Sequence, residues 1–213
     1  MLIDVVRDLY YRLPDGVQGA VLVKRRQAIW LRAGIVFVHV PKAAGTTISE
    51  AVYGRFLGHV RALDVERWSS RSARELPRFA ITRNPWDRLV SAYRDLRRRG
   101  GNGIPELESF ETFVTRWLAR RDPCRLNGVY QPQSRFVCGE DGRILVQHVG
   151  RFEALDATMD FLRELLPEMP QIGHANPSGE ALDYRTFYTP ELVELVGSIY
   201  AEDVSLFGYG FDA

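Results

Sequence analysis

The stretch that decides the fold reads Ile35-Val36-Phe37-Val38-His39-Val40-Pro41-Lys42-Ala43-Ala44-Gly45-Thr46-Thr47. A β-branched and aromatic run ends at Pro41, and a lysine, three small residues and two threonines follow before a helix-forming run. This order predicts a strand, a tight loop and the N-terminus of a helix. The first turn of a helix carries N–H groups without intrahelical partners and the positive end of the helix dipole. With Lys42 beside it, the junction is predicted to bind a phosphate-bearing ligand.

This loop differs from the Walker A loop of ATP-hydrolysing proteins. The Walker A pattern needs a glycine, four residues and then Gly-Lys-Ser/Thr, whereas Lys42 here precedes Gly45. On the loop alone, an ordinary strand-to-helix turn is the alternative interpretation.

A second strand and helix follow at Phe79–Tyr93, with Arg83 at the end of the apolar run and Pro85 two residues later. Proline suits the first turn of a helix, where its missing N–H has no partner to lose. Arg83 is therefore predicted at the carboxyl end of a strand, the edge where ligands bind in open α/β sheets. Ser91 lies about two turns into the helix and is predicted to face the same cleft. The two side chains form a second predicted phosphate clamp; a surface ion pair and a solvated serine are the alternatives.

Together the two elements resemble the carbohydrate branch of the sulfotransferases that use 3′-phosphoadenosine 5′-phosphosulfate (PAPS), which includes heparan sulfate 2-O- and chondroitin 4-O-sulfotransferases and bacterial relatives. The first is similar to that family's loop for the 5′-phosphosulfate, and the second to its element for the 3′-phosphate. The resemblance covers roughly residues 35–209 and implies that PAPS is the sulfuryl donor and adenosine 3′,5′-bisphosphate the product. The donor-binding residues that it implies are Lys42, Ala43, Ala44, Gly45, Thr46, Thr47, Arg83 and Ser91.

The resemblance also implies catalytic roles. Lys42 would stabilise the departing phosphate, and His59, in a Gly-His pair similar to one of the 2-O-sulfotransferase branch, would be the base that accepts the proton of the acceptor hydroxyl. His39 is the rival histidine, but its place in the strand favours a buried, supporting role. Glu50 and Asp64 are the carboxylate alternatives, because some relatives use an acidic base.

Two further segments are candidates for ligand contact. The irregular stretch Gln131-Pro132-Gln133 is predicted to line the acceptor cleft. The segment His174–Ser178 resembles a late family loop near the donor, so Asn176 or Ser178 is a candidate donor contact.

Alternating strands and helices predict an α/β fold, a three-layer P-loop-like sulfotransferase fold with a mainly parallel central sheet flanked by helices. We expect an N-terminal helical segment over residues 1–34 and a sulfotransferase domain over 35–213. The predicted strands are 35–40, 78–82 and one or two within 143–149. The predicted helices are 3–33 with a turn at 14–16, 46–57, 64–76 with Asp64 as N-cap, 85–99, 107–121, 154–166 and 190–207.

Composition narrows the functional class. The formal net charge of the 213-residue chain is +1, which gives no global case for nucleic-acid binding. No signal peptide or apolar run of about 18 residues occurs, so a bacterial-type cytoplasmic enzyme or a trimmed catalytic domain is expected. The four histidines lack ligand spacing, so no metal is expected. Cys124 and Cys138 are expected as reduced thiols, with one disulfide bridge as the alternative if the enzyme is secreted.

The expected partner is a hydroxyl-bearing acceptor, a carbohydrate or glycolipid, and an oligomer is left open. Two rival functions remain at this stage. One is a P-loop-like nucleotide kinase, and the other is a donor-binding interaction protein without catalysis.

Overall fold

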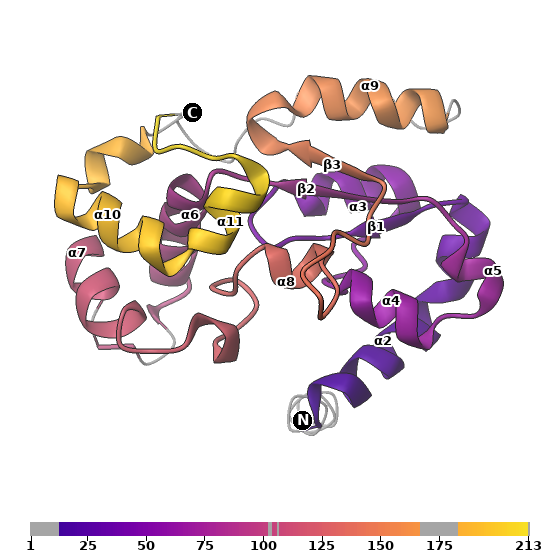
Figure 1. Ribbon diagram of the computed structural model, residues 1–213, viewed down its shortest axis with the longest axis horizontal. Helices are drawn as coiled ribbons and strands as arrows, with labels where there is room; N and C mark the ends of the chain where they lie inside the picture. Colours follow the sequence, from indigo (N-terminus) through magenta and orange to yellow (C-terminus); the bar gives the residue numbers. More distant parts are fainter. Residues whose placement is uncertain (1–12, 102–103, 106, 167–182, 213) are drawn as a thin grey trace.

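A small parallel sheet forms the centre of the fold (Figure 1). The computed structural model describes residues 13–101, 104–105, 107–166 and 183–212. Strands β1 (Val36–Val38), β2 (Arg78–Thr82) and β3 (His148–Arg151) lie in the order β1-β2-β3, and both neighbouring pairs are parallel. The structure is thus mixed helix and sheet, as predicted, while the three-layer P-loop-like arrangement stays a prediction.

Helices connect and surround these strands. Those before β3 are α2 (Asp15–Ala33), α3 (Gly45–Tyr53), α4 (Ala62–Trp68), α5 (Arg71–Arg74), α6 (Pro85–Arg98), α7 (Phe110–Thr112), the π-helix η2 (Phe113–Leu118), the 3-10 turn η3 (Pro123–Arg125) and α8 (Ser134–Val137). Those after β3 are the 3-10 turn η4 (Phe152–Ala154), α9 (Leu155–Leu165), the 3-10 turn η5 (Tyr184–Phe187), α10 (Pro190–Ile199) and α11 (Ala201–Phe207).

The two strand–helix units around β1 and β2 lie where the sequence predicts them. Helix α3 begins at Gly45 and ends at Tyr53, and the next residue, Gly54, caps it with a φ of 70°, a left-handed conformation that favours glycine. Helix α6 begins after Asn84, whose side chain accepts hydrogen bonds from the backbone N–H groups of Trp86 and Asp87. Both helices therefore follow the carboxyl ends of adjacent parallel strands, α3 after the loop 39–44 and α6 after the short link 83–84.

The predicted helix 64–76 is wrong in its start and continuity. Helix α4 begins at Ala62, and Asp64 is buried in its first turn instead of capping it. Arg61 holds the Asp64 carboxylate through two hydrogen bonds, of 2.8 and 3.2 Å. The helix ends at Trp68, because the Ser70 side chain caps a new helix, α5, by accepting from the backbone N–H of Ala73.

Two other predicted helices also differ from their predicted form, one by its shorter length and π-helical turns and one by a break. The segment 107–121 forms α7 and the π-helix η2, starting after the N-cap Ser109. The segment 190–207 breaks at buried Tyr200, whose hydroxyl donates to the carbonyl oxygen of Tyr130. Residues 3–12 of the predicted first helix and the segment 174–178 lie outside the described residues.

Two apolar clusters form the core. One covers the sheet and includes Phe37 and Phe79, which are register partners in β1 and β2 and stack at 4.6 Å. The other lies among α6, η2 and α10. Helix α2 packs against α3, α4 and α5, at the end of the molecule opposite α10 and α11 (Figure 1). The described part of the N-terminal segment thus packs against the sheet-containing body.

Candidate active site

The loop between β1 and α3 has an unusual backbone. Lys42 and Ala44 have φ values of 69° and 57°, the left-handed region that non-glycine residues rarely adopt. Such strain costs about 1–3 kcal/mol per residue and is concentrated at functional sites. At Gly45, a Cβ atom would lie 1.7 Å from Cδ2 of the His39 ring. The loop thus closes directly over buried His39, and only glycine fits at its end.

This backbone presents a row of hydrogen-bond donors. Within the described residues, the N–H groups of Ala44 to Thr47 donate to no protein acceptor. Ala44 is the N-cap of the nine-residue helix α3, and Gly45 to Thr47 form its first turn, so the helix dipole adds to their positive potential. Consecutive N–H groups in a loop with left-handed residues form anion-binding concavities. The predicted 5′-phosphosulfate loop therefore has the local geometry of an anion site.

Lys42 adds a partly buried positive charge to this loop. Its Nζ lies 3.7 Å from Oδ2 of Asp95, and its side chain is 23% exposed. Burial lowers the pKa of Lys42, the Asp95 carboxylate opposes that shift, and the nearby Arg83, Arg98 and Arg99 add to the lowering. A bound anion would therefore relieve an excess of positive charge around the Lys42 ammonium.

Arg83 lies against the same loop. Its guanidinium forms a bidentate ion pair with Asp87, through Nε at 2.8 Å and Nη2 at 2.9 Å, and Nη1 donates to the backbone carbonyl oxygen of Lys42 at 3.1 Å. The guanidinium carbon also lies 4.1 Å from the ring centroid of Phe152. Since arginine has five N–H donors, these bonds leave two for a ligand. The surface ion pair considered from the sequence exists, and it fixes the guanidinium at the edge of the loop.

Ser91 lies on the same face of α6 as the partners of these cations. Asp87, Ser91 and Asp95 follow one another at intervals of four residues, which places them in one row along the helix. Asp87 binds Arg83 at one end of the row, and Asp95 binds Lys42 at the other. Ser91 is half-buried between them. The structure thus places Lys42 of the first predicted clamp and Arg83 of the second against one face of α6.

The backbone of Arg83 is held by the side chain of Gln133, a contact that the sequence did not predict. Gln133 is fully buried, and its side-chain amide accepts from the Arg83 N–H at 2.9 Å and donates to the Arg83 carbonyl oxygen at 2.8 Å. The buried Asp203 carboxylate in turn accepts from the backbone N–H groups of Gln133 and Ser134. Burial raises the pKa of Asp203, against the effects of Arg88 and these hydrogen bonds. No spacing in the sequence links these distant residues.

His59 lies on the loop that follows α3. Its Nδ1 is 3.1 Å from the backbone carbonyl oxygen of His39, and the two imidazole centroids are 4.2 Å apart. A carbonyl oxygen can only accept, so Nδ1 carries the proton and Nε2 is the basic nitrogen. Burial lowers the pKa of His59 below its usual 6.5, the bond to His39 opposes this, and the charge of Arg26 adds to it. The imidazole is neutral at pH 7.

His39 has the supporting position expected of it. The side chain is buried, with the ring packed against Gly45 on one side and His59 on another. Burial lowers the pKa of His39 well below its usual value, and the neighbouring His59 lowers it further. A neutral, enclosed ring of this kind connects the loop that carries Lys42 to the candidate base.

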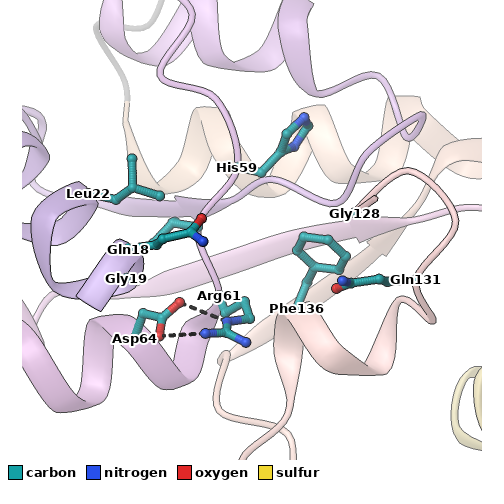
Figure 2. A pocket seen from close by; sticks show the side chains of 10 residues that line it. Gln18, Gly19, Leu22, His59, Arg61, Asp64, Gly128, Gln131 and Phe136 are labelled. Carbon is teal, nitrogen blue, oxygen red and sulfur yellow. Dashed lines mark hydrogen bonds and ion pairs between the residues drawn. The ribbon is translucent and has the colours of Figure 1, made fainter. Parts of the chain in front are cut away.

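A small pocket adjoins His59 (Figure 2). We refer to it as the α2 pocket, because three of its residues come from that helix. Its volume is about 140 Å³, and its lining comprises Gln18, Gly19, Leu22, His59, Val60, Arg61, Asp64, Gly128, Gln131 and Phe136. Of the two carboxylate alternatives for the base, Asp64 lines this pocket in its pair with Arg61. Glu50 is exposed on α3 and is not part of the lining.

Other site expectations concern metals, thiols and membranes. No group of three or more His, Cys, Asp or Glu side chains that could hold a metal occurs in the described parts of the chain. Cys124 and Cys138 are both free thiols. Among the helices that the structure describes, none combines the length and apolar character needed to cross a membrane.

Comparison with known proteins assigns the family. A model of the sulfotransferase family matches residues 31–210, most of the 213-residue chain. The chain therefore belongs to the sulfotransferase family, and its expected activity is sulfuryl transfer. No curated protein and no solved structure matches it.

Proposed function

We propose that this sulfotransferase moves the sulfuryl group of PAPS to a hydroxyl of a carbohydrate or another alcohol. The observation that supports this best is the hydrogen bond from Arg83 Nη1 to the carbonyl oxygen of Lys42. It joins the loop proposed for the 5′-phosphosulfate to the arginine proposed for the 3′-phosphate, and a donor that carries both groups would need the two side by side. A nucleotide without the 3′-phosphate would leave the Arg83 side unused.

The residues present fit such a donor. The N–H groups of Ala44 to Thr47, with the hydroxyls of Thr46 and Thr47, would hold the 5′-phosphosulfate. Arg83 and Ser91 would hold the 3′-phosphate, Arg83 through its two remaining N–H donors. The donor supplies the activated sulfuryl group.

Lys42 and His59 would carry the chemical roles. The Lys42 ammonium would neutralise negative charge on the bridging oxygen of the donor. The nearby positive charges of Arg83, Arg98 and Arg99 repel this ammonium, so the transition state, in which the negative charge on that oxygen is largest, would be stabilised most. His59 accepts the proton of the acceptor hydroxyl at Nε2, while the carbonyl oxygen of His39 keeps Nδ1 protonated. Sulfuryl transfer between oxygens needs no change in oxidation state, so these residues suffice for the proton and charge balance.

Calorimetric titration tests the donor assignment. Adenosine 3′,5′-bisphosphate should bind tightly, and ATP should bind weakly, because ATP lacks the 3′-phosphate. Transfer of ³⁵S from labelled PAPS to a panel of glycans, glycolipids and simple alcohols tests the reaction. Tighter binding of ATP than of adenosine 3′,5′-bisphosphate would favour the kinase interpretation. Binding of the donor without labelling of any acceptor would favour the non-catalytic interpretation.

A further inference from the structure

We propose that the α2 pocket binds an uncharged sugar ring of the acceptor, and that helix α2 thereby determines acceptor specificity. This inference rests on the proposed function, since it names the class of acceptor and the place where the acceptor lies. It goes beyond the family match, because Gln18, Gly19 and Leu22 precede residue 31, where the match begins.

The pocket lies beside both candidate catalytic elements. His59 is part of its wall. Gly128, also in the lining (Figure 2), is so close to the start of the loop that carries Lys42 that a Cβ there would lie 4.0 Å from Cγ of Pro41. A molecule in the pocket would therefore contact the candidate base His59 and would be separated from the loop that carries Lys42 by Gly128.

The lining offers the groups that recognise hydroxyls. Gln131 donates through Nε2 to the carbonyl oxygens of Cys124 and Leu126, at 3.3 and 2.8 Å, so its amide oxygen is the atom it can present to a ligand. Asp64 adds a carboxylate. The rings of Phe136 and His59 lie 6.4 Å apart and add apolar surface against which a sugar face can pack.

The charges favour a neutral ring over a uronate or a sulfated sugar. Of the described residues in the lining, Arg61 is the one with a permanent cation, and it is already bound to Asp64 through two hydrogen bonds. The Asp64 side chain is only 6% exposed, so its charge is weakly screened. The Arg61–Asp64 pair is neutral overall, so a uronate or sulfate in the pocket would lose hydration without gaining a cation that is not already paired with Asp64. Hydroxyl groups can donate to Asp64 and Gln131 at no such cost.

Ligand-detected NMR tests the pocket directly, with methyl glycosides of glucose, galactose and mannose and the matching methyl uronides. At least one neutral glycoside should bind the full-length protein, and its uronide should bind at least about tenfold more weakly. Gln18→Trp and Leu22→Trp, which fill the pocket from successive turns of α2, should each abolish binding. Gln27→Trp is the matched control, because Gln27 lies on the same helix and contacts Ser70 instead of the pocket.

The proposal is overturned if no neutral glycoside binds, if the uronides bind as well, or if both tryptophan variants, shown to be folded by circular dichroism, still bind. A parallel titration with adenosine 3′,5′-bisphosphate separates this proposal from the proposed function. Loss of glycoside binding in the two variants with unchanged nucleotide affinity supports the pocket. A wild-type protein that binds glycoside but no nucleotide would contradict the donor assignment alone.

Discussion

The guanidinium of Arg83 donates a hydrogen bond of 3.1 Å from Nη1 to the backbone carbonyl oxygen of Lys42. Arg83 directly follows β2, and Lys42 lies four residues beyond the end of the adjacent parallel strand β1, in the loop that leads to α3. Because the Lys42 backbone has a left-handed φ of 69°, its carbonyl oxygen is directed to a position that an ordinary loop would not give it. The bond couples the orientation of the loop that carries Lys42 to the position of the Arg83 guanidinium, the main residue of the proposed second clamp.

Replacement of Arg83 tests the second clamp. Arg83→Ala should weaken binding of adenosine 3′,5′-bisphosphate by about 2–5 kcal/mol, the usual cost of removing one partner of a partly buried charged pair. Binding of adenosine 5′-monophosphate, which lacks the 3′-phosphate, should change far less. Calorimetric titration of both nucleotides measures the difference, and Arg94→Ala, an exposed position on the same helix, is the control. Equal weakening for both nucleotides would contradict the assignment.

Replacement of Lys42 separates binding from catalysis. Lys42→Ala should lower kcat more than it lowers affinity for adenosine 3′,5′-bisphosphate, because the charge that Lys42 meets grows as the phosphate departs. Steady-state kinetics with labelled PAPS and a nucleotide titration give the two quantities. Lys24→Ala, an exposed lysine of α2, should change neither. An unchanged kcat with a raised KM would make Lys42 a binding residue only.

The sequence predicted best where local chemistry determines structure. The strand, loop and helix around Lys42 and the helix after Arg83 follow from β-branched runs, small residues and a proline, which act over a few positions. The interrupted helices were missed because the breaks at Ser70 and Tyr200 depend on a capping serine or a tertiary contact at 2.9 Å. Helical periodicity continues across both points.

The support of the site was harder to predict from sequence. Gln133 holds both backbone polar groups of Arg83 across 50 residues of chain, and Asp203 holds Gln133 across 70. Such pairs have no periodicity and become visible only when the chain is folded. The row of Asp87, Ser91 and Asp95 could have been found, because intervals of four residues place side chains on one helix face.

The Gln133 contact gives a prediction about stability and nucleotide selectivity. Gln133→Met removes the amide while retaining an extended side chain, and leaves the buried N–H and carbonyl oxygen of Arg83 unpaired. Each unpaired group costs about 1–3 kcal/mol, so the urea midpoint of unfolding should fall. Selectivity for the 3′-phosphate should fall as well. Gln147→Met, at a more exposed glutamine that accepts from the Arg78 N–H, is a control that should preserve selectivity.

The close approach of Gly45 to His39 gives a prediction in which a second substitution, at His39, should reverse part of the effect of the first. Gly45→Ala should destabilise the protein by about 1–3 kcal/mol, as overpacking does in a close-packed core. It should also weaken nucleotide binding, because the new methyl group would displace the loop that carries Lys42. The double variant Gly45→Ala/His39→Ala removes the ring that the new methyl would meet and should recover part of the nucleotide affinity. Gly16→Ala, with no atom within 4 Å of the new Cβ, should be neutral. Absence of any rescue would mean that the His39 ring is not the cause.

The base assignment is tested by the pH dependence of turnover. Burial lowers the pKa of His59 below 6.5, so the imidazole is neutral and active at pH 7, and kcat should decrease only as pH falls through that lowered pKa. His59→Ala should reduce kcat by about 10²–10⁴-fold and remove this acidic limb, with nucleotide affinity nearly unchanged.

The stability of the fold also depends on pH in this range. The buried His39 has a lowered pKa as well. Protonation of a histidine whose pKa is lowered by folding favours the unfolded chain, so the free energy of unfolding declines as pH falls below 6.5. Circular dichroism at each pH separates loss of fold from loss of base. If His59→Ala keeps near-normal turnover and the acidic limb persists in folded protein, the base is elsewhere, and Asp64→Asn, in the same pocket, becomes the next variant to measure.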